Sequence, residues 1–130
     1  MSGLNTFKKN ERLKSKKAIE ALLKTGQKKN FFPIKVFVGK SGFQDVPLKF
    51  LVMVPKRKIA SAVERNRVKR VLRELWRLHK SVLSVHINQK SACFHVAFLY
   101  QSDVLPDFQT LKRKMPSVLN YILCAIQEQQ

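Results

Sequence analysis

The sequence predicts an α+β fold in which helices cover a small sheet. The chain has 130 residues, which is the length of a single domain. Apolar residues make up 45% of it, enough for a hydrophobic core. Segments with helical and with strand periodicity are interleaved along the chain, and no linker or low-complexity stretch separates two halves. We therefore expect a two-layer α+β sandwich over residues 1–130, with loose ends at about 1–9 and 127–130.

The first half of the chain predicts one helix and two strands. Apolar residues fall at helical spacing over Ser15–Leu23, with its first residue as the N-cap and Gly26 as the stop. Apolar side chains then alternate over Phe31–Val38, which predicts a strand. The run Leu48–Val54 is rich in β-branched and aromatic residues and closes at Pro55. We expect the two strands to pair as a hairpin.

The second half predicts a long helix, a strand and a last helix. The apolar period becomes helical over about Ser61–Lys80, the clearest helix of the chain. Cys93–Tyr100 has the composition of a buried strand. A C-terminal helix begins at Asp107 or Thr110, and Pro116 is expected to kink or restart it.

The helix over 61–80 is amphipathic in an unusual way, because its polar face is almost entirely basic. A helical projection places these polar residues on one arc: Arg65, Asn66, Lys69, Arg70, Arg73 and Arg77. It places these on the arc that would dock on the sheet: Val68, Val71, Leu72, Leu75, Leu78 and His79. Trp76 lies between the two arcs, where it either packs at the edge of the core or stacks on a base or an arginine.

The charge of the chain points to a polyanionic partner. Lys and Arg number 26 against 8 Asp and Glu, which gives a formal net charge of +18. Residues 1–80 hold 22 of these basic side chains and 5 of the acidic ones. Like charges four residues apart on a helix repel, so a helix built only for stability would interleave acids. The basic face, and the second basic run Lys56-Arg57-Lys58 before it, are better explained by phosphate binding.

Several other chemistries are disfavoured by the residues present. The acidic residues are scattered and form no close carboxylate pair for metal-assisted hydrolysis. His79, His86 and His95 lack metal-ligand spacing with either cysteine. Cys93 and Cys124 lie in apolar runs, which predicts reduced core residues rather than a disulfide. From the acids, histidines and cysteines we expect no catalytic or metal-binding residues in the protein itself. The sequence shows no signal peptide or membrane span, so we expect a soluble, cytoplasmic protein.

One segment carries a family resemblance. The stretch Val54–Glu74, with its Arg65-Asn66-Arg67 motif, resembles the most diagnostic segment of the bacterial ribonuclease P protein subunit. The similarity extends to Arg12-Leu13, to Gly26 and to Phe37, which stands where the family has a tyrosine. It covers roughly residues 10–125.

The resemblance implies a protein cofactor of an RNA enzyme. In this family the RNA subunit carries out the endonucleolytic removal of the 5′ leader from precursor tRNA, with Mg²⁺ held mainly by RNA. The protein binds the RNA subunit and the precursor tRNA, and it broadens substrate specificity. One protein assembles with each RNA subunit. The implied fold is α-β-β-(β)-α-β-α, like the second domain of ribosomal protein S5. It has about four strands, a left-handed crossover and a short extra strand near Lys28 to Asn30.

The resemblance also implies two sets of site residues. Those that meet the catalytic RNA are Arg65, Asn66, Arg67, Lys69, Arg70 and Arg73. Those that meet the leader, in a cleft between the basic helix and the sheet face, are Phe37, Lys56, Arg57, Lys58 and Arg12. The chain departs from the family at Ile19 and Leu23, where phenylalanines are frequent, and at Lys56 and Ala60, where a serine and a glycine are frequent.

Two other functions share these features. In a DNA-binding regulator the basic helix would enter the major groove, where Asn66 and the arginines read adenine and guanine edges. A structural ribosomal protein would have the same charge and size. The spread of charge from Lys8 to Lys80 favours folded RNA over duplex DNA, and stimulation of leader removal separates the family function from a ribosomal one.

Overall fold

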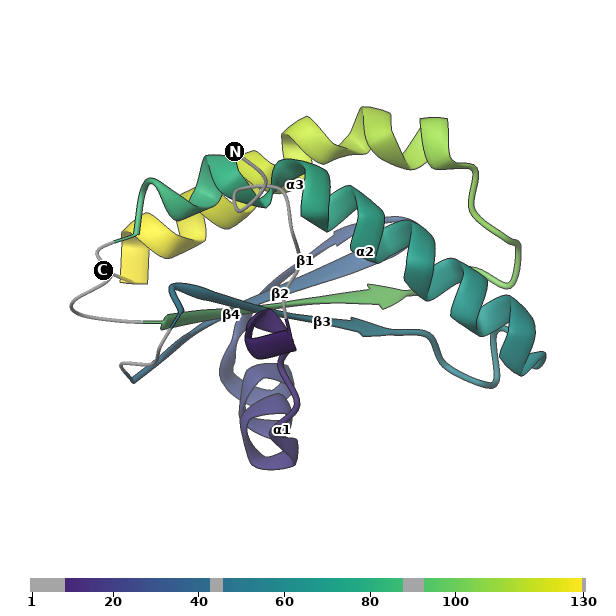
Figure 1. Cartoon of the computed structure of the whole chain (residues 1–130), viewed down its shortest axis with the longest axis horizontal. Coiled ribbons are helices and arrows are strands. Elements are labelled where there is room, and N and C mark those ends of the chain that lie inside the picture. Colours follow the sequence, from purple (N-terminus) through teal and green to yellow (C-terminus); the bar gives the residue numbers. More distant parts are fainter. Residues whose placement is uncertain (1–8, 43–45, 88–92, 130) are drawn as a thin grey trace.

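The computed structural model describes residues 9–42, 46–87 and 93–129, and in them a four-stranded sheet carries helices on both faces (Figure 1). The elements in chain order are a short 3-10 helix (Lys9–Glu11), α1 (Lys16–Thr25), β1 (Gln27–Phe31), β2 (Ile34–Ser41), β3 (Leu48–Met53), α2 (Ala62–Ser84), β4 (Cys93–Tyr100) and α3 (Phe108–Gln129). The predicted α+β class is confirmed. The short extra strand is also present, as β1.

The order of the strands, β1-β2-β4-β3, differs from the sequence prediction. The expected hairpin between the strands over 31–38 and 48–54 is wrong, because β4 lies between β2 and β3. β4 is buried along nearly its whole length, so it takes a central place, whereas alternate residues of β3 are only partly buried. The hairpin of this sheet is β1–β2, an antiparallel pair joined by a turn at Phe32–Pro33.

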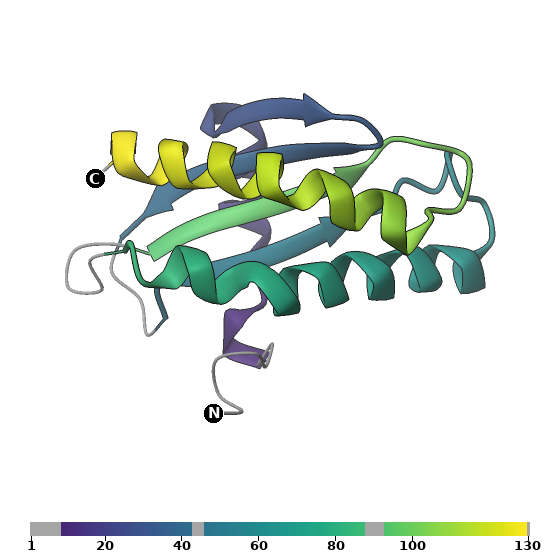
Figure 2. The same ribbon diagram turned by 90° about the horizontal axis from the view of Figure 1, so that it is seen from above.

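The parallel pair β3 and β4 is connected through α2. Figure 2 shows the sheet from the helix side, with α2 in front of it. When the picture is turned so that the β3 and β4 arrows point up, β4 lies to the left of β3. This is the left-handed crossover that the family resemblance implies. Such connections are almost always right-handed, so the arrangement is distinctive.

α1 has the predicted residues at both ends, and α2 begins after a serine cap of the same kind. The Ser15 hydroxyl accepts a hydrogen bond from the Ala18 amide at 3.2 Å, and the Ser61 hydroxyl accepts one from the Glu64 amide at 3.3 Å. α1 stops at Gly26, where a Cβ would come within 2.6 Å of the Leu22 carbonyl oxygen. Glycine is needed here for close approach rather than for an unusual backbone angle, since its φ is −68°.

The C-terminal helix corrects two expectations and part of a third. α3 continues through Pro116, so the proline does not restart it; Pro116 and Lys112, whose carbonyl loses its helical partner, both lie on the exposed side. The helix also continues through 127–129, which the sequence analysis assigns to a loose end, and the Gln27 side chain donates a hydrogen bond to Glu128 at 3.2 Å. Cys124 is exposed and Cys93 is buried, so only Cys93 is a core residue as predicted.

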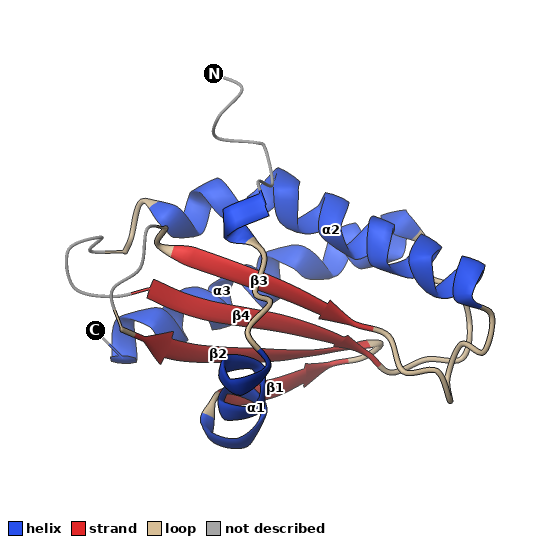
Figure 3. Cartoon of the chain, turned by 60° about the horizontal axis from the view of Figure 1, so that its bottom comes forward, coloured by secondary structure: helices blue, strands red, loops and turns tan. Residues whose placement is uncertain are grey.

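The main core lies between the sheet and the layer formed by α2 and α3. Trp76 of α2 stacks on Phe50 of β3 with ring centroids 4.3 Å apart, and Phe98 of β4 packs edge-on against both rings. A smaller cluster occupies the opposite face, where α1 crosses the strands (Figure 3). Phe37 and Leu22 are buried there.

The face that α2 turns to the sheet is rotated from the predicted one. Trp76, expected at the edge of the core, is 1% exposed, whereas Leu78, expected to dock on the sheet, is 40% exposed. The stacking of the largest side chain of the helix on Phe50 accounts for this rotation. Trp76 is therefore unavailable to a base. His79 lies at the edge of the buried face, as predicted, with its Nδ1 2.7 Å from the Leu75 carbonyl oxygen.

Candidate nucleic-acid interface

The exposed side of α2 and the segment before α1 together line a broad hollow of about 490 Å³. We call it the α2 hollow, and its residues are Arg12, Asn66, Arg70, Arg73, Glu74 and Arg77. It thus gathers four guanidinium groups around a single carboxylate. Three of the six residues assigned to the catalytic RNA meet here, and Arg12, assigned to the leader, lies with them.

Arg12 reaches the hollow because the chain before α1 extends the edge of the sheet. Arg12 forms a parallel bridge with Phe50 of β3, and the Leu13 amide donates a hydrogen bond to the Phe50 carbonyl at 2.9 Å. Glu11 accepts a hydrogen bond from Lys80 of α2, and these side chains are 16% and 6% exposed. Lys80, which the sequence analysis counts with the basic surface, is therefore used inside the protein to hold this segment on α2.

The guanidinium groups of the hollow perturb one another. The pKa of Arg73 is lowered by partial burial and by the charge of Arg12, which shows that two like charges are held close together. Arg77 donates to Glu74 at 3.0 and 2.5 Å, and this contact raises the pKa of Arg77 and lowers that of Glu74. Mutual repulsion among the remaining cations favours binding of a polyanion, which relieves it.

The other three predicted residues of the basic helix lie outside the hollow. Arg65 points back under the start of α2, where its Nη1 donates to the carbonyls of Ile59 and Ala60 at 3.0 and 2.7 Å. It therefore fixes the connection between β3 and α2. Arg67 is exposed and Lys69 is half-buried, and neither lines the hollow.

A second concave region lies where β1, β3 and β4 end, and Figure 3 shows these ends side by side. We call it the strand-end groove; it has a volume of about 340 Å³, and its residues are Asn30, Phe32, Pro55, Arg57, Lys58, Leu99, Tyr100 and Gln101. Arg57 and Lys58 were predicted to meet the leader and both are exposed here. Lys56 is exposed in the same turn.

Phe37, the predicted leader-binding aromatic, is on the other face of the sheet from α2. Its ring is only 5% exposed, and it packs with Leu13, Leu22 and Ala97. The Lys28 and Lys35 ammonium groups lie 5.8 and 5.6 Å from the ring centroid.

The expected cleft between the basic helix and the sheet face is wrong. Trp76, Phe50 and Phe98 are buried between α2 and the sheet, so that space is occupied by the core. The structure thus separates the predicted leader residues. Arg57 and Lys58 line the strand-end groove, Phe37 lies beneath α1, and Arg12 is in the α2 hollow.

Comparison with known proteins decides the family. A family model described as Ribonuclease P matches residues 7–122. The chain is 35% identical over 112 residues to the ribonuclease P protein component of Porphyromonas gingivalis, an alignment that covers 85% of this chain and 82% of that protein. The chain belongs to the ribonuclease P protein family. It is a protein component of ribonuclease P, which is an endoribonuclease complex.

More distant ribonuclease P proteins are similar in sequence or in fold. The protein component of Chlorobaculum tepidum is 26% identical over 129 residues, which cover 92% of this chain and 84% of that one. The solved RNase P protein of Staphylococcus aureus superposes with a TM-score of 0.65 at 18% identity, over 85% of this chain and 94% of that chain. The solved RNase P protein of Thermotoga maritima superposes with a TM-score of 0.64 at 22% identity, over 87% of this chain and 96% of that chain. The resemblance carried by Arg65-Asn66-Arg67 is confirmed as family membership.

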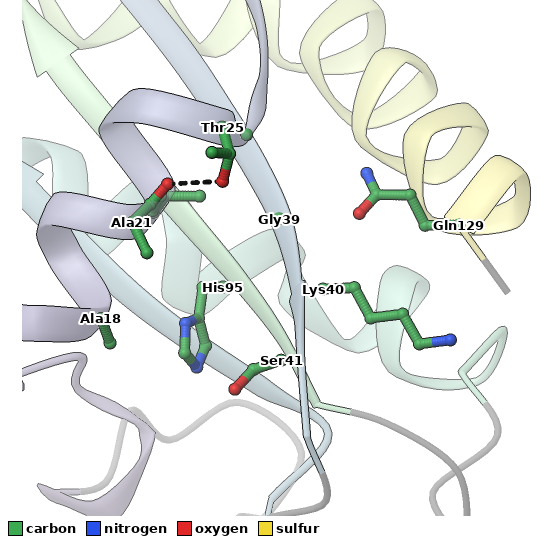
Figure 4. Close-up of a pocket in the computed structure, with 10 residues that line it drawn as sticks. Ala18, Ala21, Thr25, Gly39, Lys40, Ser41, His95 and Gln129 are labelled. Carbon is green, nitrogen blue, oxygen red and sulfur yellow. Dashed lines mark hydrogen bonds between the residues drawn. The ribbon is translucent and has the colours of Figure 1, made fainter.

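A further hollow of this ribonuclease P protein lies beside α1, away from the predicted residues (Figure 4). His95 of β4 is 5% exposed there, and its Nε2 is buried without a hydrogen-bond partner. Burial lowers the pKa of His95, and the charge of Lys49 on the adjacent strand adds to the effect. His95 is therefore neutral at physiological pH.

Within 9–42, 46–87 and 93–129, no group of three or more His, Cys, Asp and Glu side chains is arranged to hold a metal ion. Over the same ranges, the helices are too short or too polar to cross a bilayer.

Part of both concave regions was not predicted from the sequence. Arg77 was placed on the basic arc but not among the site residues, and Asn30, Phe32 and Gln101 of the strand-end groove were not predicted. For Phe32 a signal was present, since a phenylalanine directly before a proline between two strands lies at a turn, where a large ring is exposed.

Proposed function

We propose that this chain binds the catalytic RNA of ribonuclease P through the α2 hollow. It holds the 5′ leader of precursor tRNA at the turn over 56–58, which lies between β3 and α2. Of the residues assigned to the catalytic RNA, Asn66, Arg70 and Arg73 line the hollow together with Arg12, and Arg65, Arg67 and Lys69 lie on α2 outside it. Those assigned to the leader are Lys56, Arg57 and Lys58 in the turn before α2, and Phe37, which lies on the other face of the sheet beneath α1. The RNA cuts the leader, with Mg²⁺ held mainly by RNA phosphates, and the protein supplies binding surface.

The α2 hollow is the observation that carries this proposal. Arginine binds phosphate oxygens through paired N–H donors and stacks on bases, so clustered arginines suit the irregular backbone of a folded RNA. Arg12 comes from the segment before α1, so the basic surface includes residues of two separate parts of the chain rather than of one helix. A recognition helix in a DNA major groove reads bases with one helix, so the composite hollow favours RNA.

The turn at Lys56–Lys58 supports the leader assignment. Its three cations are exposed at the end of the sheet, and the loop that carries them is fixed by Arg65 and by hydrogen bonds from Lys58 and Ile59 to the Pro55 carbonyl at 3.0 and 3.2 Å. A row of cations on an ordered backbone suits tracking of a single strand. One protein per RNA subunit, in the cytoplasm, and a broadened range of substrates complete the proposal.

The test is cleavage of a precursor tRNA by a bacterial ribonuclease P RNA at low Mg²⁺, with and without the protein. We expect the protein to stimulate cleavage at the correct 5′ site, and the double variant Arg70→Ala/Arg73→Ala to lose most of this stimulation. Lys112→Ala/Arg113→Ala removes the same charge from the exposed side of α3 and serves as the matched control.

Tight RNA binding without stimulation would overturn the proposal and favour a ribosomal role. Preference for a duplex DNA sequence over both RNAs would instead favour a transcription regulator. Equal losses in the two double variants would show that total charge, rather than the α2 hollow, governs the activity.

A further inference from the structure

The strand-end groove contains an aromatic ring that the fold leaves in solvent. Phe32 is 59% exposed at the tip of the β1–β2 turn, and it is the exposed aromatic side chain among the described residues. Its neighbour Phe31 instead packs against Tyr121 of α3, with ring centroids 5.8 Å apart. Of these two neighbouring rings, Phe31 therefore packs against the core and Phe32 faces solvent. With 59% of its surface exposed, the Phe32 ring is accessible to a binding partner.

The backbone around this ring is fixed from three sides. The Gln101 amide donates to the Pro33 carbonyl at 2.7 Å, which ties the turn to the end of β4. Tyr100, the last residue of β4, donates its hydroxyl to the Val104 carbonyl. The turn with Arg57 and Lys58 is held by the Pro55 carbonyl. Ring and cations are therefore presented on ordered backbone, which lowers the entropic cost of binding.

The groove also contains an unused hydrogen-bond acceptor. Gln101 Oε1 is buried in the structure without a donor, although a buried polar atom without a partner is destabilising. Asn30 adds an exposed side-chain amide on the same wall. An occupant that supplies an N–H group to Gln101, a flat face to Phe32 and a negative charge to Arg57 and Lys58 would satisfy all of these features.

An unpaired nucleotide has those three properties. We propose that the strand-end groove binds one nucleotide of the precursor leader, with its base stacked on Phe32. A rotation of the Gln101 side chain would turn its unpaired amide oxygen toward the Watson–Crick edge of the base, which donates to it, and the phosphate lies at Arg57 and Lys58. In a duplex the faces and edges of the bases are occupied, so the groove selects single strands. This proposal rests on the leader binding proposed above and assigns Phe32 and Gln101 to it.

The experiment uses the holoenzyme reconstituted with a bacterial ribonuclease P RNA, and precursor tRNAs that carry 2-aminopurine at successive leader positions. Stacking on an aromatic ring quenches this fluorophore. We expect quenching at one leader position in the wild type, recovery of fluorescence in Phe32→Ala, and renewed quenching in Phe32→Trp. Removal of one base–aromatic stack weakens precursor binding about 5- to 150-fold, whereas binding of mature tRNA is unchanged.

Val82→Ala is the matched control, because it shortens an exposed apolar side chain of α2 outside the groove. Thermal unfolding of Phe32→Ala should match that of the wild type, since the ring is exposed. If wild type prefers the leader-bearing precursor and Phe32→Ala retains both affinity and quenching, the stacking proposal is wrong while the proposed function stands. If the wild type shows no leader preference, the proposed function itself fails. Loss of affinity for the catalytic RNA alone in Phe32→Ala would assign the groove to that RNA and overturn the leader assignment.

Discussion

Arg70→Ala is the sharpest test of the α2 hollow. Arg70 is exposed on α2 and lines the hollow, and its removal leaves the packing of Val68 and Leu72 intact. Each phosphate neutralised by a cation contributes about 0.7 to 0.9 to the slope of log K against log salt. Loss of one contact therefore makes the affinity of the variant for the catalytic RNA less steeply dependent on salt. Between 50 and 200 mM salt, the ratio of wild-type to variant affinity should shrink about threefold.

The assay is a titration of catalytic RNA with protein at four or five salt concentrations. Arg113→Ala, an exposed arginine of α3, carries the same charge change and should leave the slope unaltered. Arg77→Ala should lower it less than Arg70→Ala, because Arg77 is already paired with Glu74. An identical slope for wild type and Arg70→Ala would refute the placement of RNA phosphates in the hollow, whatever the loss in affinity at one salt concentration.

Three further predictions concern the scaffold behind the two surfaces. Glu11→Gln leaves the buried Lys80 ammonium without its counter-charge and should lower the free energy of unfolding by about 3 kcal/mol, whereas the double variant with Lys80→Met recovers part of this loss; urea titration measures both. Trp76→Ala removes the ring stacked on Phe50 and should cost about 3 to 5 kcal/mol in the same assay, with a smaller loss for Trp76→Phe. The pKa of His95 lies below its ordinary 6.5, so the unfolded chain binds a proton more readily and the folded state loses stability as the pH falls below that value. Between about pH 7.5 and 5.5, the free energy of unfolding should fall more for the wild type than for His95→Gln. Equal decreases would contradict the burial argument.

The features that were predicted from sequence depend on local signals. Ser15 and Gly26 mark the ends of α1 through contacts with residues a few positions away, and the structure makes those contacts. Alternation in the strand over 34–38 likewise fixes which side chains share a face, and Val36 and Phe37 do lie in different clusters. Such signals identify an element and its buried side.

The features that were missed depend on contacts between distant segments. Alternation in β3 is equally compatible with β2 or β4 as a neighbour, so the strand order was not determined by it. The rotation of α2 was decided by the fit of Trp76 on Phe50, which lies on another element. Arg12 joins the α2 hollow only because its segment bridges to β3 at Phe50.

The connection between β3 and α2 joins the two proposed binding surfaces mechanically. Asn66 lines the α2 hollow, while its neighbour Arg65 holds the carbonyls of Ile59 and Ala60 immediately after the turn with Lys58. We therefore expect a backbone shift at the start of α2 to move the turn that carries Lys58. The two surfaces are formed on either side of one helix end, so catalytic RNA bound at the hollow would fix the direction from which a leader reaches the groove. Arg65→Lys, which retains the charge but cannot reproduce the guanidinium contacts, should therefore weaken precursor binding more than it weakens assembly with the catalytic RNA.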